Sequence, residues 1–110
     1  MARLEYLELP VGDRAAAKRF YAQAFGWTFT DFGPDYAATM NGDTDVGLDA
    51  ASDRVKAPLP VIRVEDLDAT LASVEAASGV VTVPVFAFPG GRRFHFRDVD
   101  GHELAAMQPD

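Results

Sequence analysis

The chain has 110 residues, of which 48% are hydrophobic, and a formal net charge of −7. This length allows one compact domain but not two. The negative net charge argues against nucleic-acid binding, because proteins that bind nucleic acids need a basic face. Cysteine is absent, which excludes disulfides and thiolate metal sites and fits a reducing cytoplasm. No apolar run approaches a membrane span and no secretory leader precedes the first strand, so we expect a cytoplasmic protein without a membrane partner.

The first half of the chain predicts one strand, one helix and three further strands. Alternation over Arg3 to Leu9 places Tyr6 and Glu8 on one face of the first strand. Asp13 is the expected cap of a helix with Arg14, Lys18 and Gln23 outside. Its expected buried stripe consists of Ala17, Phe20, Tyr21 and Ala24. The later strands are predicted at Trp27 to Phe32, Tyr36 to Met40 and Asp45 to Ala50.

The second half repeats this pattern after a polar linker at residues 53–57. The strand Leu59 to Val64 is followed by Asp66, the expected cap of a second helix. The buried stripe of that helix is predicted to consist of Leu67, Leu71 and Val74. Strands are then predicted at Val80 to Phe88, Arg92 to Arg97 and His102 to Met107.

The two halves are related by an internal repeat with an offset of 53 residues. The matching pairs are Val11 and Val64, Asp13 and Asp66, and Gly26 and Gly79. Each glycine is expected to take the left-handed conformation that closes a helix. Both halves therefore predict the order β-α-β-β-β, and we expect a single α+β domain of two tandem βαβββ modules, residues 1–52 and 58–110.

The chain resembles the vicinal oxygen chelate superfamily in three segments: LELPVGDRAAAKRFYAQAFGW, VIRVEDLDATLASVEAASG and FRDVDGHELAAM. This superfamily includes glyoxalase I, bleomycin-resistance proteins and extradiol dioxygenases, and the resemblance covers almost the whole chain. It implies curved mixed sheets that form the two halves of an open barrel around a ligand, in a protein that is a homodimer. Because this fold hosts many activities, the resemblance does not identify the chemistry.

The resemblance also locates the metal ligands of the metal-dependent members, which are His, Glu or Gln side chains on the first and last strands of the modules. The corresponding positions here are Tyr6, Leu59, Ala105 and the segment Val46 to Leu48. Leucine, alanine and valine cannot bind a divalent ion, and tyrosine seldom does. We therefore expect no metal and no cofactor at the usual site.

Several polar side chains are expected to face the cavity instead. Arg93 and His95 share a strand face opposite Phe94 and Phe96. An inward carboxylate beside an inward imidazole can act as a general acid and base, so Glu8 and His95 are the catalytic candidates. The expected ligand-binding set is Tyr6, Glu8, Arg63, Arg93, His95 and Glu103. In the simpler alternative, Glu8 pairs with Arg63 or Arg93 and His95 is a hydrogen-bonded wall residue.

Three functions stay open on these residues. The first is a metal-free homodimer that binds a small, largely apolar molecule, as bleomycin-resistance proteins do. The second is an enzyme, a lyase, isomerase or dioxygenase, that uses acid–base residues or a divalent metal at a relocated site of Glu8, His95 and Glu103. The third is an accessory module that acts through protein contacts.

Overall fold

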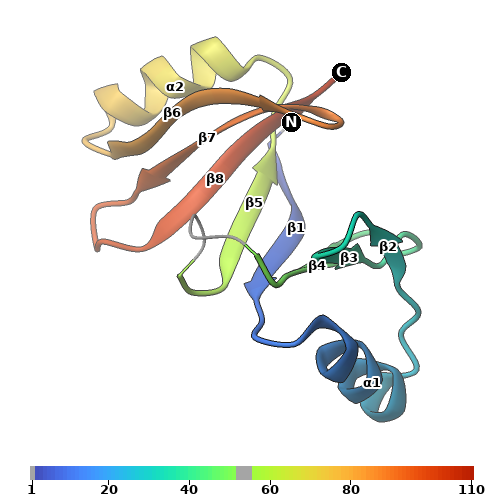
Figure 1. The fold of residues 1–110 in the computed structure, drawn as a ribbon. Coiled ribbons are helices and arrows are strands. Elements are labelled where there is room, and N and C mark those ends of the chain that lie inside the picture. Colours follow the sequence, from blue (N-terminus) through green and yellow to red (C-terminus); the bar gives the residue numbers. More distant parts are fainter. Residues whose placement is uncertain (1, 52–55) are drawn as a thin grey trace. The chain divides into compact units, whose positions relative to one another are not determined.

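The computed structural model describes residues 2–51 and 56–110. Its elements repeat the order of one strand, one helix and three strands, which confirms two tandem βαβββ modules and an α+β fold (Figure 1). They are β1 (Arg3–Pro10), α1 (Arg14–Phe25), β2 (Thr30–Phe32), β3 (Tyr36–Ala38), β4 (Asp45–Asp49), β5 (Leu59–Arg63), α2 (Leu67–Ala76), β6 (Val80–Phe88), β7 (Gly91–Arg97) and β8 (Glu103–Pro109). Neither helix in this part of the chain has the length and apolar character needed to cross a membrane.

The chain forms two compact units, which we describe separately. The first unit is Tyr6–Leu59, and the second is the chain up to Glu5 together with Pro60–Asp110. In the first unit, β1 pairs in parallel with β4, β4 pairs antiparallel with β3, and β3 pairs antiparallel with β2. In the second unit, β5 pairs in parallel with β8, and β8, β7 and β6 pair antiparallel in that order. The strand pairing within each unit is therefore mixed, as predicted.

Two strands of the first unit are shorter than predicted, because β2 begins at Thr30 and β3 ends at Ala38. The predicted linker at residues 53–57 lies largely outside the described residues. The module boundaries on either side of that linker therefore stay predictions.

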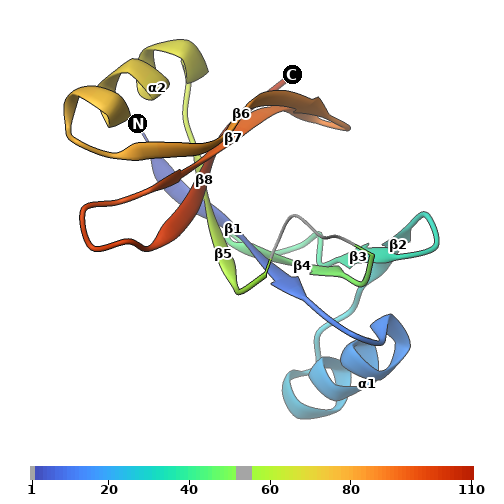
Figure 2. The same ribbon diagram turned by 60° about the vertical axis from the view of Figure 1, so that its left-hand side comes forward.

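The core of the second unit lies between α2 and one face of its sheet, and α2 lies beside β6 in both ribbon views (Figures 1 and 2). Its fully or nearly fully buried members are Val64, Leu67, Phe94 and Ala106. The predicted helix stripe is confirmed, since Leu67 belongs to this core and Leu71 and Val74 pack against it. Because the Phe94 side chain packs in this core, alternation places those of Arg93 and His95 on the opposite face of the sheet.

Both helices begin at the aspartates that the internal repeat predicts. An Asp13 carboxylate oxygen accepts a hydrogen bond from the N–H of Ala16 at 3.1 Å. The Asp66 carboxylate accepts the equivalent bond from the N–H of Ala69 at 3.0 Å. Each bond satisfies a backbone donor that the first helical turn leaves without an intrahelical partner, so both predicted N-caps are confirmed.

The ends of the two helices differ, although the repeat predicts that they match. Gly26 closes α1 with a φ of 71°, as expected. After α2, Ser78 has a φ of 73°, so this serine and not Gly79 takes the left-handed conformation. Gly79 is needed for a different reason. A Cβ at this position would lie 2.6 Å from Cγ1 of Val74 and 3.3 Å from the carbonyl oxygen of Arg97, which leaves room only for a hydrogen.

Ser78→Gly is expected to stabilise the protein by about 0.5–1 kcal/mol, because glycine removes the left-handed strain but adds entropy to the unfolded chain. Urea unfolding should show a higher midpoint with an unchanged slope. Ser73→Gly, in the exposed middle of α2, is the matched control and should lower stability by about 0.5 kcal/mol. A midpoint that does not rise for Ser78→Gly would show that Ser78 is not strained.

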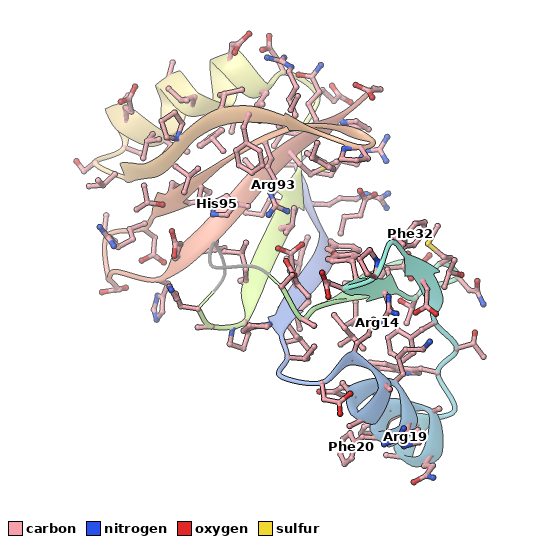
Figure 3. All side chains as sticks on the ribbon, viewed as in Figure 1. Arg14, Arg19, Phe20, Phe32, Arg93 and His95 are labelled. Atoms are coloured by element: carbon pink, nitrogen blue, oxygen red, sulfur yellow. The ribbon has the colours of Figure 1, made fainter. Side chains whose placement is uncertain are left out.

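The predicted burial of α1 is wrong, since none of its residues is buried and Phe20 is 57% exposed (Figure 3). The basic side of the helix instead contacts the β2–β3 hairpin. Arg14 donates hydrogen bonds to the carbonyl oxygens of Gly33 and Tyr36, and Lys18 lies 2.9 Å from an Asp31 carboxylate oxygen. The β2–β3 hairpin thus offers acceptors that the two cations of α1 satisfy together.

Candidate functional site

A buried arginine and a buried histidine lie with two partly buried phenylalanines on the face of the second unit's sheet opposite α2. Arg93 and His95 point from β7 to this face, with exposed fractions of 6% and 0% (Figure 3). The guanidinium carbon of Arg93 lies 5.3 Å from the centre of the Phe86 ring and 5.6 Å from that of Phe88. The Phe86 and His95 rings meet edge to face, with centres 5.7 Å apart. We call these four residues the arginine–histidine cluster.

Irregularities in β6 place the two phenylalanines of this cluster. The pairing of β6 with β7 shifts by one residue between Val81 and Val83 and again between Val83 and Phe86. As a result, Phe86 lies opposite Arg93. Sequence alternation treats Val80 to Phe88 as one regular strand and misses this arrangement. The signal that could have revealed it is Pro84, because proline inside a strand marks an edge or a bulge.

The chemistry of the cluster favours a ligand with a negatively charged oxygen group. Arginine does not lose its proton in proteins, and its planar guanidinium offers five N–H donors that match a carboxylate. The faces of Phe86 and Phe88 attract the cation electrostatically and hold it in place. The cluster therefore combines an anion-binding group with apolar rings, the usual composition of a small-molecule site.

In the first unit, two tyrosines and a glutamate form a hydrogen-bonded chain. The Tyr36 hydroxyl donates to Oε2 of Glu8 at 3.0 Å, and the Tyr6 hydroxyl lies 2.6 Å from that of Tyr36. The single hydroxyl hydrogen of Tyr36 is donated to Glu8, so Tyr6 must donate to Tyr36. Glu8 is only 4% exposed. The structure thus connects the predicted pair Tyr6 and Glu8 through Tyr36, a residue that the sequence does not single out.

Gly47 makes room for this tyrosine–glutamate chain. It lies on β4, opposite Glu8 on one side and Ala38 on the other. A Cβ at Gly47 would overlap the hydroxyl oxygens of both Tyr6 and Tyr36. A glycine inside a predicted strand often marks a close approach of other groups to the backbone. Gly47 was therefore the sequence signal that could have revealed this packing.

Burial, and next the negative charge of Glu8, raise the pKa of the Tyr36 phenol above its ordinary value of 10.0. The stabilisation from Tyr36 is therefore fully present below about pH 10 and is lost as the pH rises further, because the unfolded phenol then ionises. We expect tyrosinate absorbance from Tyr36 to appear only together with loss of the folded circular dichroism signal. Tyr36→Phe should weaken the alkaline dependence of stability. Ionisation of all three tyrosines in the folded protein would contradict this expectation.

Arg63 and Glu103, two further residues of the predicted ligand-binding set, have other partners. The Arg63 side chain is 45% exposed and lies 3.2 Å from an oxygen of Glu5, so this arginine forms a surface ion pair. Glu103 is exposed and accepts a hydrogen bond from the hydroxyl of Thr82 at 2.6 Å. In the ladder between β7 and β8, Glu103 lies opposite Arg97, whereas His95 lies opposite Ala105.

The residues that correspond to the metal ligands of the metal-dependent members have few donor atoms. Leu59 and Ala105 are buried, and their side chains contain no donor atom. Tyr6 has a hydrogen-bond partner in Tyr36, and Val46 to Leu48 contains no side-chain donor. Within residues 2–51 and 56–110, no three His, Asp or Glu side chains are grouped so that they could hold a metal ion. Glu8 belongs to the first unit and His95 and Glu103 to the second, so the relocated set of these three residues stays a prediction.

Comparison with known proteins agrees with this fold. Residues 3–106 match the sequence profile of the Glyoxalase/Bleomycin resistance protein/Dioxygenase superfamily. The chain belongs to this superfamily. The match confirms the resemblance noted from the sequence, since the vicinal oxygen chelate proteins are the same group. Membership establishes the fold but leaves the reaction or ligand open.

A curated relative in this superfamily covers most of the chain. The chain is 29% identical over 102 residues to the protein named "Putative glyoxylase CFP32" from Mycobacterium bovis, a match that includes 83% of this chain and 39% of that protein. The chain thus spans about two fifths of the length of the curated relatives it matches.

Two solved structures show the same fold. The Mn(II)-bound glyoxalase from Novosphingobium aromaticivorans is 26% identical, with a TM-score of 0.70 over 98% of this chain and 40% of that one. The methylmalonyl-CoA epimerase from Mycobacterium tuberculosis is 15% identical, with a TM-score of 0.78 over 97% of this chain and 87% of that one. At 15% identity, the second likeness concerns the fold alone.

Proposed function

We propose that this superfamily member binds a small, largely apolar molecule that carries a negatively charged oxygen group. The observation that supports this function is the arginine–histidine cluster, in which a buried guanidinium lies against two phenylalanine rings beside a buried imidazole. The rings supply apolar contact area, and Arg93 supplies the charged hydrogen bonds that orient the ligand. His95 adds a group that can donate or accept a hydrogen bond near neutral pH.

We also propose that the ligand binds without a resident metal ion, because the residues present do not fit the metal of the metal-dependent members. Leu59 and Ala105 have no donor atom, and β7, which carries the fixed positive charge of Arg93, lies next to the strand of Ala105. Elemental analysis of protein purified without chelator should find no stoichiometric zinc, iron, nickel or manganese. A stoichiometric metal that is lost in Glu8→Ala would overturn this part of the proposal.

A thermal-shift comparison of matched ligands tests the binding function. Carboxylates such as phenylacetate and cinnamate are expected to raise the melting temperature, because a ligand that binds only the folded state stabilises it. The corresponding amides, which have the same shape but no charge, should be much weaker. Equal stabilisation by acids and amides would contradict the role of Arg93. Absence of any stabilising carboxylate would contradict the binding function and favour an accessory module that acts through protein contacts.

A second candidate function, acid–base catalysis, is supported by the tyrosine–glutamate chain. A hydroxyl whose hydrogen bonds lead to a carboxylate can pass a proton along that chain, and Glu8 can receive it. The 26% identity to a glyoxalase adds support for an enzyme. Deuterium exchange from solvent into a ligand's C–H group next to a carbonyl measures this activity. Exchange should fall about 100-fold in Glu8→Gln while ligand binding persists, and equal exchange in both proteins would exclude Glu8 as the base.

We further propose that the protein is a homodimer in the cytoplasm. The exposed aromatic side chains of α1 support a second copy as partner, since Phe20 and Phe25 are 57% and 62% exposed and contact Tyr21. Exposed apolar groups of this size often mark a contact between proteins. Sedimentation velocity measures the mass in solution, and a monomer at all concentrations would contradict the dimer.

A further inference from the structure

A cavity apart from the arginine–histidine cluster and from the tyrosine–glutamate chain lies wholly within the first unit. Its volume is about 300 Å³. One wall comes from the segment that follows α1, and the other from the start of β4 and the connection between β3 and β4. The residues that matter for its chemistry are Trp27, Thr39, Gly42 and Asp45. A cavity of this size accommodates a single small ring with a substituent.

Trp27 gives this cavity an aromatic wall that is held in position. Its ring stacks on that of Tyr21, with centres 5.3 Å apart and planes at 11°. The centre of the Phe25 ring, at the end of α1, lies 5.5 Å from the centre of the Trp27 ring. Trp27 nevertheless stays 37% exposed, so part of the indole is open to a ligand. Indole is the best of the side-chain rings at binding cations.

Asp45 supplies a fixed carboxylate to the same cavity. Its Oδ1 accepts hydrogen bonds from the Thr39 hydroxyl at 2.8 Å and from the N–H of Gly42 at 2.9 Å. The Thr39 hydroxyl oxygen in turn accepts from the N–H of Val46 at 3.0 Å, so the hairpin holds the carboxylate from two directions. Both bonds to Asp45 use Oδ1 and neither uses Oδ2, so the second carboxylate oxygen can face the positive group of a ligand.

We propose that this cavity binds a small organic cation that carries a ring, such as a benzylammonium ion. The ring stacks on Trp27, and the positive group lies between the indole and Asp45. Asp45 is the single charged residue among the described residues that line the cavity, so no neighbouring lysine or arginine competes for it. The net charge of −7 also raises the local concentration of cations. This ligand has the opposite charge to that proposed for the arginine–histidine cluster.

The chain contains one tryptophan, so intrinsic tryptophan fluorescence reports on this cavity directly. Titration with benzyltrimethylammonium should change the fluorescence of Trp27 with saturation, and added salt should weaken the effect. Phenylacetate and benzyl alcohol are the anionic and neutral comparisons and should not give saturable changes at the same concentrations. Failure of the cation to saturate, or equal binding of benzyl alcohol, would overturn the proposal.

Asp45→Asn and Asp43→Asn form a matched pair for the same titration. Both remove one negative charge, and the asparagine at position 45 keeps an Oδ1 carbonyl that can accept the two hairpin hydrogen bonds. Binding of benzyltrimethylammonium should weaken about tenfold in Asp45→Asn and less than about twofold in Asp43→Asn. Equal weakening would show a general charge effect and overturn the site. If Asp45→Asn loses its folded circular dichroism spectrum, the proposal is tested by titrating the unmodified protein with benzyltrimethylammonium, phenylacetate and benzyl alcohol.

Discussion

Gly47→Ala is expected to destabilise the protein by about 2–4 kcal/mol and to break the tyrosine–glutamate chain. The added methyl group would occupy the space of both tyrosine hydroxyls, and neither ring can move away without losing the hydrogen bond that joins Tyr6 to Tyr36. Displacement of Tyr36 would also remove a donor from the buried carboxylate of Glu8, and a buried charge that loses a hydrogen bond is costly. Urea unfolding followed by circular dichroism measures the loss.

Gly12→Ala is the control for this experiment, because a Cβ at Gly12 would meet no atom within 4 Å. Its stability should stay within about 0.5 kcal/mol of the unmodified protein. Adding Tyr6→Phe and Tyr36→Phe to Gly47→Ala removes the two oxygens that the methyl group overlaps, so part of the lost stability should return. If Gly47→Ala were as stable as Gly12→Ala, the hydroxyls of Tyr6 and Tyr36 would not pack closely against Gly47.

Arg93→Met is expected to weaken the binding of carboxylate ligands about 100-fold while the protein keeps its fold. Loss of one partner from a buried charged hydrogen bond costs about 2–5 kcal/mol in binding. Methionine fills a similar volume, and its sulfur packs well against aromatic rings such as Phe86 and Phe88. Calorimetric titration with the most stabilising carboxylate measures the change in affinity.

Arg92→Met is the matched control for Arg93→Met. The two arginines are neighbours on β7, but Arg92 is 42% exposed in its side chain and lies 3.8 Å from Asp68 on α2. Both variants lose one positive charge, so they share any long-range effect on an anionic ligand. Affinity in Arg92→Met should stay within about twofold of the unmodified protein. An equal loss in both variants would mean that net charge, and not the arginine–histidine cluster, governs binding.

Features that depend on neighbours along the chain could be predicted from the sequence. The two N-cap aspartates need only a carboxylate at the start of a helical pattern, and both are in place. The stripe of Leu67, Leu71 and Val74 follows from helical periodicity. The opposite orientation of Arg93 and Phe94 follows from alternation along one strand.

Contacts between distant segments could not be predicted in this way. The link from Tyr6 through Tyr36 to Glu8 joins two strands that are far apart in the sequence, and it exists because Gly47 lies between them in the sheet. The position of Phe86 against Arg93 results from two shifts in strand register that alternation does not reveal.

The sequence of this protein therefore specified its repeat, its helix starts and the two faces of its strands, because propensity and capping act over a few residues. The tertiary structure determined which of the inward polar groups meet. It connected Glu8 to a tyrosine, paired Arg63 with Glu5, and placed Arg93 against two aromatic rings. These outcomes depend on strand register and on the space left by single glycines, which are properties of the assembled sheets and not of any one segment.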